Sequence, residues 1–216
     1  LESQASVRAA AKTFLAAHPT LDVLVLSAGI FAKARAETED GIEKTFAVNY
    51  LSHFLLANLL KGALEKAAPS RVVLIASRYG GAKINFDDLM LKTTKFSIMS
   101  SVPRTKLAEV LFAQEAAERW AAAGIRVNAI HPGLVARTQL LEEVRGPFRF
   151  LTNLFGGTPE QGADTAVWLA SSPEAADITG KLMEKRKPAA TPGQGSDPAA
   201  RKRLWDESMR LAKLLA

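Results

Sequence analysis

Short polar and glycine-containing segments follow three apolar runs of the sequence. Residues 27–29 (Ser-Ala-Gly) follow the first run, Ser77 follows the second, and residues 131–133 (His-Pro-Gly) follow the third. In a sheet of parallel strands, ligands bind in the crevice beyond the carboxyl ends of the strands. If the three runs are such strands, these segments converge although they lie far apart in the chain. We therefore expect one ligand-binding crevice at this edge.

The composition narrows the chemistry that this crevice can perform. The chain has no cysteine, which excludes a disulfide scaffold and a thiol nucleophile. The three histidines, His18, His53 and His131, are dispersed along the sequence. Without cysteine, such spacing does not suggest a metal site, so we expect none. We read His53 and His131 as packing or hydrogen-bonding residues. The absence of cysteine fits a reducing compartment, and we expect a cytoplasmic protein.

The elements that position these segments follow from hydrophobic periodicity. Four apolar runs bounded by breakers predict buried parallel strands, at residues 22–27, 71–76 and 125–131, with a weaker candidate at 178–184. Amphipathic patterns predict helices at 5–17, 39–66 (with Thr38 as N-cap) and 104–123. A Thr158…Gln161 capping box with Pro159 starts another. A loop-like linker after Glu184 precedes a last helix that is capped by Ser196 or Asp197. Alternating strands and helices predict an α/β fold.

Length, charge and hydropathy restrict the class of protein further. The 216 residues suit a single α/β domain. Most of the net charge of +6 lies after Lys181, and the cluster at residues 201–203 is read as a solvated helix face rather than a nucleic-acid or membrane-surface site. The apolar runs fall far short of the roughly 20 residues that span a bilayer. The first residues lack a signal peptide and an initiator methionine, which suggests a piece of a longer chain.

Six stretches in this order resemble the short-chain dehydrogenase/reductase family, in its retinol-dehydrogenase-like branch, which includes the WW-domain oxidoreductase type. They are LDVLVLSAG, TEDGIEKTFAVNYLSHFLL, RVVLIAS, TKLAEVLFAQEAAER, VNAIHPG and TPEQGADTAVWLASSPE, and they span most of residues 6–187. The resemblance implies a Rossmann-type doubly wound parallel sheet, truncated to strands 4 to 7 of the family fold. Residues 1–187 would form this partial oxidoreductase domain, and 188–216 its linker and C-terminal helix.

The resemblance also implies NAD- or NADP-dependent hydride transfer to or from an apolar alcohol, aldehyde or ketone. Three residues match catalytic positions of the family: by this resemblance Asn49 would anchor a water, Ser77 would steady the substrate oxygen, and Lys106 would hold the nicotinamide ribose. Each has a plainer alternative: a buried structural asparagine, a strand-ending serine and an exposed helix lysine. The residues expected to contact the cofactor are Ala28, Gly29, Lys106, Pro132, Gly133 and Val135.

One departure from the family pattern bears directly on activity. Val102 stands four residues before Lys106, where the family has its acid–base tyrosine. Valine can neither donate nor accept a proton, and the loss of a general acid typically costs about 10²–10⁴-fold in rate. The chain has two tyrosines: Tyr79 could reach the crevice, whereas Tyr50 should point elsewhere. The glycine-rich TGxxxGxG turn of the family is also missing from the sequence.

Two functions therefore remain open. The first is an NAD(P)-dependent oxidoreductase that is impaired by the missing turn and by Val102. The second is a non-catalytic pseudoenzyme or interaction protein, since family members pair through the two long helices matched by 39–66 and 104–123, and a homo-oligomer is expected from them. The strand at 22–27 would have an open edge in the truncated sheet, and an exposed apolar edge promotes association.

Overall fold

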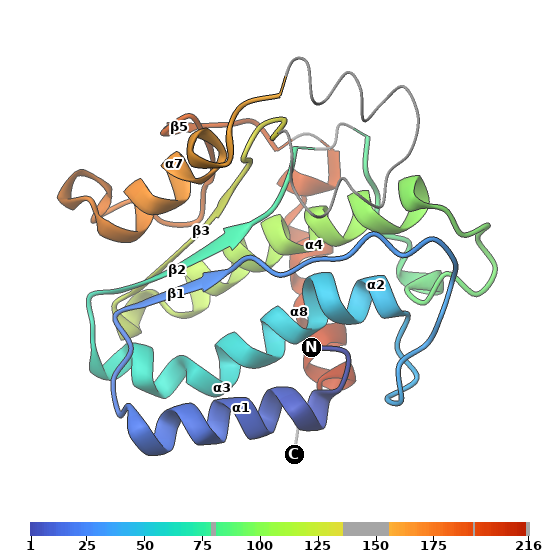
Figure 1. The fold of residues 1–216 in the computed structure, drawn as a ribbon, viewed down its shortest axis with the longest axis horizontal. Helices are drawn as coiled ribbons and strands as arrows, with labels where there is room; N and C mark the ends of the chain where they lie inside the picture. Colours follow the sequence, from blue (N-terminus) through green and yellow to red (C-terminus); the bar gives the residue numbers. More distant parts are fainter. Residues whose placement is uncertain (79–80, 136–155, 192, 215–216) are drawn as a thin grey trace.

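Four parallel strands and one short antiparallel strand form a single sheet in this computed structural model, which describes residues 1–78, 81–135, 156–191 and 193–214 (Figure 1). The spatial order is β1-β2-β3-β4-β5, the same as the order along the chain. All pairs are parallel except β4 with β5. The strands are β1 (Val23–Leu26), β2 (Ser70–Ile75), β3 (Ile125–Ile130), β4 (Leu182–Glu184) and β5 (Lys187–Pro188). The predicted parallel α/β sheet is confirmed.

The strand register brings the carboxyl ends of β1, β2 and β3 to one edge of the sheet. Leu26 pairs with Leu74, and Ile75 pairs with Ile130. One further bond, from the Ala76 amide to the Ile130 carbonyl at 2.9 Å, extends the β2–β3 pairing beyond the strands. The segments that follow these strands therefore start level with one another, as the sequence predicts.

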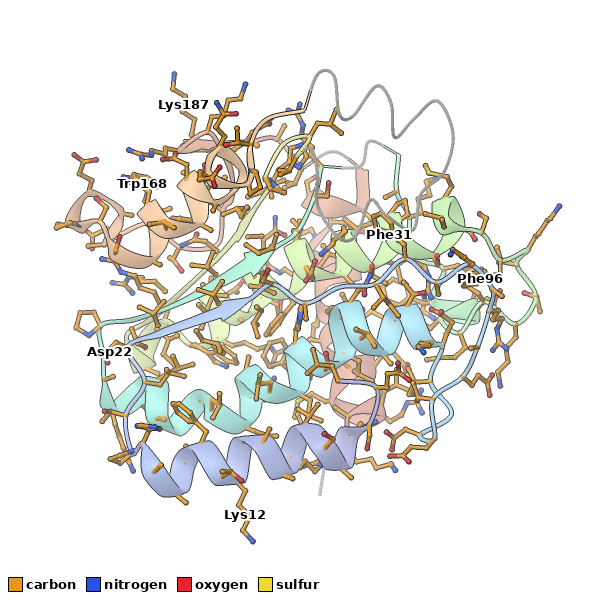
Figure 2. All side chains as sticks on the ribbon, in the orientation of Figure 1. Lys12, Asp22, Phe31, Phe96, Trp168 and Lys187 are labelled. Carbon is orange, nitrogen blue, oxygen red and sulfur yellow. The ribbon has the colours of Figure 1, made fainter. Side chains whose placement is uncertain are left out.

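Helices cover both faces of the sheet (Figure 1). On one face, α7 (Pro159–Ser171) packs against β2 and β3. On the other face, α3 (Ser52–Lys66) and α4 (Ile98–Arg119) pack against the sheet. A further layer lies outside them: α1 (Gln4–Ala17) covers α3, and α8 (Pro198–Leu211) covers α4. In Figure 2, Asp22 marks the amino end of β1 and Phe31 lies beyond its carboxyl end.

The helix expected to start at residue 39 with Thr38 as N-cap starts later, and that prediction is wrong. Residues 38–41 form a turn in which the Gly41 amide donates to the Thr38 carbonyl at 2.9 Å. Gly41 has φ +73°, a conformation that favours glycine. The helix begins with α2 (Lys44–Phe46), whose N-cap Glu43 accepts bonds from the amides of Thr45 and Phe46. A π-helical segment, Ala47–Leu51, then joins α2 to α3.

Helix α4 is longer at its start than expected. Ser97 and Ser100 form a capping box, and the helix starts at Ile98, six residues before the predicted boundary. Pro103 lies within the second turn rather than before the helix. Its fixed φ suits a helix, but in the second turn its missing N–H removes one backbone bond and its ring crowds the carbonyl four residues before it. The helix ends at Arg119, and Ala121–Ala123 form a 3₁₀ turn that closes on Gly124 at φ +68°.

The C-terminal part follows the predictions with one correction. The Thr158–Gln161 capping box starts α7, and Asp197 caps α8 through the Ala199 amide. The stretch after Glu184, expected to be a loop, instead contains β5, which pairs with β4 through Glu184–Lys187. Lys185 and Arg186 form the tight turn between these strands, both at positive φ.

An aromatic cluster attaches α8 to the long helices. The Trp205 ring of α8 lies 5.1 Å from Phe54 of α3, and 6.0 Å from both Phe112 of α4 and Trp120. Beside it, the hydroxyls of Tyr50 and Ser208 are hydrogen-bonded at 2.7 Å. Aromatic rings bury large apolar surfaces, and these contacts hold α8 on the face that α3 and α4 share. This is the face through which pairing of two subunits was expected.

A buried ion pair fixes the start of α2 against α4. The Arg104 guanidinium donates to Glu43 at 2.6 Å and to the Leu89 carbonyl at 2.5 Å, and both charged side chains are buried. The guanidinium also lies 5.2 Å above the Phe46 ring. A buried charge is tolerated only when it is paired and hydrogen-bonded. This pair therefore fixes how the segment before the π-helix enters the core.

Removing one member of the pair should destabilise the protein strongly. Arg104→Met leaves the Glu43 carboxylate buried without its counter-charge, and we expect a loss of roughly 3–5 kcal/mol in the free energy of unfolding. Urea unfolding followed by circular dichroism measures it. The control is Lys61→Met, which removes the exposed pair of Lys61 with Glu65 and should cost at most about 0.5 kcal/mol. Equal losses in both variants would contradict the role of the Arg104–Glu43 pair.

The outer edge of β1 should cause this chain to associate. Among the described residues β1 pairs with β2 alone, and the Val25 side chain is 47 % exposed. We expect size-exclusion chromatography to show a species of larger mass than one 216-residue chain. Val25→Lys should shift that species toward the monomer. Val167→Lys is the matched control, because Val167 is 59 % exposed but lies on helix α7. A monomeric wild-type chain would refute this prediction.

Candidate functional site

The loop after β1 is held by Asn49, which lies in the π-helical segment. Its side-chain oxygen accepts a bond from the Ile30 amide at 2.8 Å, and its nitrogen donates to the Ile30 carbonyl at 3.0 Å. Both halves of the buried side-chain amide thus bind one residue of the loop. Residues 27–29, just before it, keep their exposure to solvent. π-Helical segments often occur at functional sites, and this one presents Asn49 to the carboxyl edge of the sheet.

Lys106 reaches the end of β2 from α4. Its ammonium donates to the Ile75 carbonyl at 2.6 Å and to the Glu109 carboxylate at 2.8 Å. Only 12 % of the Lys106 side chain is exposed. An ordinary surface lysine would extend into water, so the alternative of an exposed helix lysine is wrong. Ile75 lies two residues before Ser77, so the ammonium contacts the strand close to that serine.

A buried chain of polar groups continues from Lys106 into the core. The Glu109 carboxylate, which has no exposure to solvent, also bonds Nδ1 of His53 at 3.0 Å. His53 comes from α3, so the carboxylate joins the two long helices beneath the sheet. The sequence did not reveal this chain of contacts. The available signal was Glu109 itself, a charged residue three positions after Lys106 in an otherwise apolar stretch of helix.

Ser77 and His131 lie beside one another at the ends of β2 and β3. The serine hydroxyl is 3.3 Å from Nδ1 of the imidazole. Burial lowers the pKa of half-buried His131 below its ordinary value near 6.5; the charge of Glu184 opposes this shift and that of Arg78 adds to it. Glu184 and Arg78 are themselves 3.6 Å apart. The histidine is therefore mostly uncharged at neutral pH and can accept a proton, which confirms a hydrogen-bonding role for His131.

Val102 is buried, with 1 % exposure, one turn before Lys106 on the same helix. It offers no polar side-chain atom to the site. Tyr50 does not replace the missing hydroxyl, because its side chain is buried against α8 and bonded to Ser208. Burial raises the pKa of its phenol well above the ordinary range. The prediction that Tyr50 points elsewhere is confirmed, whereas Tyr79 lies outside the described residues.

The loop after β3 is fixed against the start of α7. Gly133 adopts φ +75°, and the Gly157 amide donates to the Leu134 carbonyl at 2.8 Å. The side chain of Val135 occupies the space where a Cβ on Gly162 would lie. Pro132 and Gly133 therefore follow His131 at the crevice edge, while the Val135 side chain faces α7. Arg137 stands where the family resemblance implies a carboxamide-binding threonine, with Thr138 one residue later, and both lie outside the described residues.

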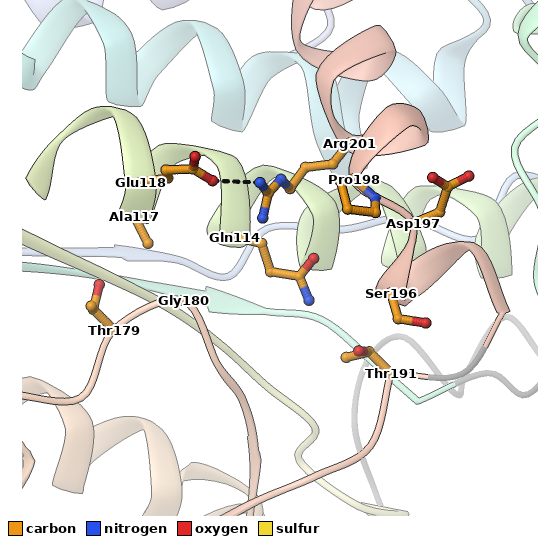
Figure 3. A pocket seen from close by; sticks show the side chains of 10 residues that line it. All are labelled: Gln114, Ala117, Glu118, Thr179, Gly180, Thr191, Ser196, Asp197, Pro198 and Arg201. Carbon is orange, nitrogen blue, oxygen red and sulfur yellow. Dashed lines mark hydrogen bonds and ion pairs between the residues drawn. The ribbon is translucent and has the colours of Figure 1, made fainter.

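One hollow adjoins this site, and a second lies away from it. A narrow one of about 20 Å³, enough for roughly one water molecule, adjoins Ser77 and has apolar walls that include Pro103, Leu107, Val110 and Leu182. A larger one of about 420 Å³ lies elsewhere, between the end of α4 and the start of α8 (Figure 3). Most of the residues that line it are polar, and its Arg201 is paired with Glu118. The basic cluster at residues 201–203 is thus partly neutralised within the chain.

Two further findings concern the described residues alone. In these parts of the chain, histidine, aspartate and glutamate side chains form no group of three that could hold a metal ion. No helix among them has the length and apolar character needed to cross a membrane.

Comparisons with known proteins agree with this geometry. Residues 1–147 match the family model for short chain dehydrogenase. Human retinol dehydrogenase 14 is 40 % identical over all of this chain, which spans 66 % of that protein's length. An uncharacterised protein of Mycobacterium paratuberculosis shares the structure with a TM-score of 0.77 and 27 % identity, over 98 % of this chain and 73 % of that one.

A more distant structure shows the same fold. The Pseudomonas aeruginosa protein RhlG, solved with NADP, has a TM-score of 0.64 and 23 % identity, over 85 % of this chain and 72 % of its own. The six matching stretches, the parallel sheet and the family match all point the same way. This chain belongs to the short-chain dehydrogenase family, in its retinol-dehydrogenase-like branch.

Proposed function

We propose that this protein is an NAD(P)-dependent oxidoreductase that acts slowly on an apolar alcohol or its carbonyl counterpart. The observation that carries the proposal is the convergence of three predicted site residues on the carboxyl edge of the sheet. Asn49 holds the loop after β1, Ser77 follows β2, and Lys106 donates to the Ile75 carbonyl at the end of β2. The slow rate follows from Val102, which leaves the substrate oxygen without the family's phenol.

The residues at this edge fit the nicotinamide half of the cofactor. Its ribose hydroxyls need donors, and an ammonium has three N–H groups. Ile75 and Glu109 take two of those of Lys106, which leaves the third for a hydroxyl. The exposed backbone at Ala28 and Gly29 and the fixed turn at Pro132 and Gly133 supply further contacts. When bound, the nicotinamide would accept or supply the hydride.

Two observations support an apolar substrate. The hollow beside Ser77 has apolar walls from α4 and β4. The human relative carries the name retinol dehydrogenase, and retinol is a long apolar primary alcohol. We therefore propose substrates of this class, oriented by a hydrogen bond between the Ser77 hydroxyl and the reacting oxygen. The narrow hollow would have to widen as such a molecule enters.

A non-catalytic role is the second candidate, and Val102 is the observation that favours it. Interaction through the α3/α4 face would require α8 to leave, since Trp205 and Ser208 bury that face. A partner could instead pair with the edge of β1 that no described strand covers.

The proposal is tested first by cofactor binding and then by restoring the phenol. We expect NADPH or NADH to quench the tryptophan fluorescence of the wild-type protein, and retinaldehyde to be reduced slowly. Val102→Tyr should raise turnover by about 10²–10⁴-fold, because it returns a proton donor one turn before Lys106.

Val102→Phe is the matched control, because it adds the same ring to the buried position without the hydroxyl. Cofactor binding and unfolding midpoint should be alike in the two variants, while turnover separates them. Equal turnover of the tyrosine and phenylalanine variants would show that the missing phenol does not limit the rate. A wild-type protein that binds neither cofactor would overturn the proposed function and favour the non-catalytic role.

A further inference from the structure

Val102 leaves a chemical problem that the rest of the site has to solve. Oxidation of an alcohol releases a proton from its oxygen, and a base must accept that proton. Valine cannot do so, Tyr50 is buried against α8, and the Lys106 ammonium carries no lone pair. Among the described residues, the side chain that hydrogen-bonds Ser77 is His131.

We propose that His131 is the proton acceptor of this site, acting through the hydroxyl of Ser77. The inference rests on the proposed oxidoreductase function and names the group that replaces the missing phenol. The pair is built by the sheet register, which places the ends of β2 and β3 side by side. With the ring proton on Nε2, Nδ1 presents its lone pair to the serine hydroxyl at 3.3 Å.

The proton transfer balances in the oxidation direction. A bound, oxidised nicotinamide would take the C–H electron pair of the alcohol as hydride, which leaves a carbonyl. The proton of the alcohol oxygen passes to Oγ of Ser77 while the hydrogen of that serine moves to Nδ1 of His131. The resulting imidazolium then loses a proton to water, because His131 is only half-buried and keeps contact with solvent.

Burial makes the ring a base rather than an acid at neutral pH. It lowers the pKa of His131, an effect that the charge of Glu184 on β4 opposes and that of Arg78 after β2 reinforces. Lys106, from α4, is already engaged by Ile75 and Glu109. Because the pKa of His131 lies below its ordinary value, the neutral ring predominates at pH 7 and above. Oxidation should therefore reach a plateau above about pH 7 and fall as the ring is protonated.

A measurement without cofactor tests the pair directly. The chain has three histidines, so single His→Gln variants assign each imidazole signal in an NMR pH titration. The hydrogen bond from Ser77 stabilises the neutral ring, and Ser77→Ala should therefore raise the titration midpoint of His131 while leaving that of His18 unchanged. A midpoint that stays the same or falls would overturn the proposal, whatever the protein's activity.

Turnover then tests the function of the pair. The wild-type protein is assayed with NADP⁺ or NAD⁺ and retinol from pH 5 to 10. His131→Gln should lower the oxidation rate at least about 10²-fold and abolish the fall in rate at low pH. His18→Gln, a change at an exposed histidine beside Phe14, should leave both unchanged.

The outcomes separate the two proposals. Two outcomes overturn only the proposed role of His131 and leave the oxidoreductase function standing. One is turnover that survives in His131→Gln. The other is a rate that keeps rising toward pH 10, as it would with a phenol or hydroxide as base. A wild-type protein without turnover at any pH overturns the oxidoreductase function, and the proton-acceptor role falls with it. An oxidation rate whose plateau depends on both Ser77 and His131 supports both proposals.

Discussion

A single buried carboxylate, that of Glu109, connects the elements on which the site depends. A carboxylate without access to water is costly unless opposite charge and hydrogen bonds surround it. Lys106 and His53 satisfy it from α4 and α3, and Lys106 in turn binds the Ile75 carbonyl of β2. The position of the lysine is thus set by the electrostatics of the core. The contact with Glu109 also offsets part of the positive charge that Lys106 brings to the crevice.

Other buried polar side chains fix loops at both ends of the strands in a similar way. Asn49 uses both ends of its amide to hold the backbone of Ile30. Asn128 of β3 donates to the Ile178 carbonyl at 2.6 Å and accepts from the Lys181 amide at 3.1 Å, which fixes the approach to β4. In each case a side chain from a helix or strand replaces a missing backbone partner. The core thus holds the loop after β1, at the crevice, and the segment before β4, at the opposite end of the strands.

The parts of this structure that sequence could predict are those governed by local pattern. Apolar runs located the first three strands, and the capping box at Thr158 located α7, because these signals need no distant partner. The start at Lys44 was missed because Glu43 acts as a cap only while Arg104 neutralises it from α4. Strand β5 was missed because its pairing exists only beside β4. Ser77 was predicted as a site residue, but its contact with His131 depends on strand register.

The position of α8 has a consequence for the association of this chain with other molecules. Trp205 and Ser208 dock on the α3/α4 face from a helix that belongs to the same polypeptide. A tethered element meets its docking surface at an effective concentration on the order of millimolar. A separate subunit in a cell arrives at far lower concentration, so it competes at a disadvantage for the same surface. The C-terminal helix therefore acts as a built-in competitor that favours the single chain over the pair at that face.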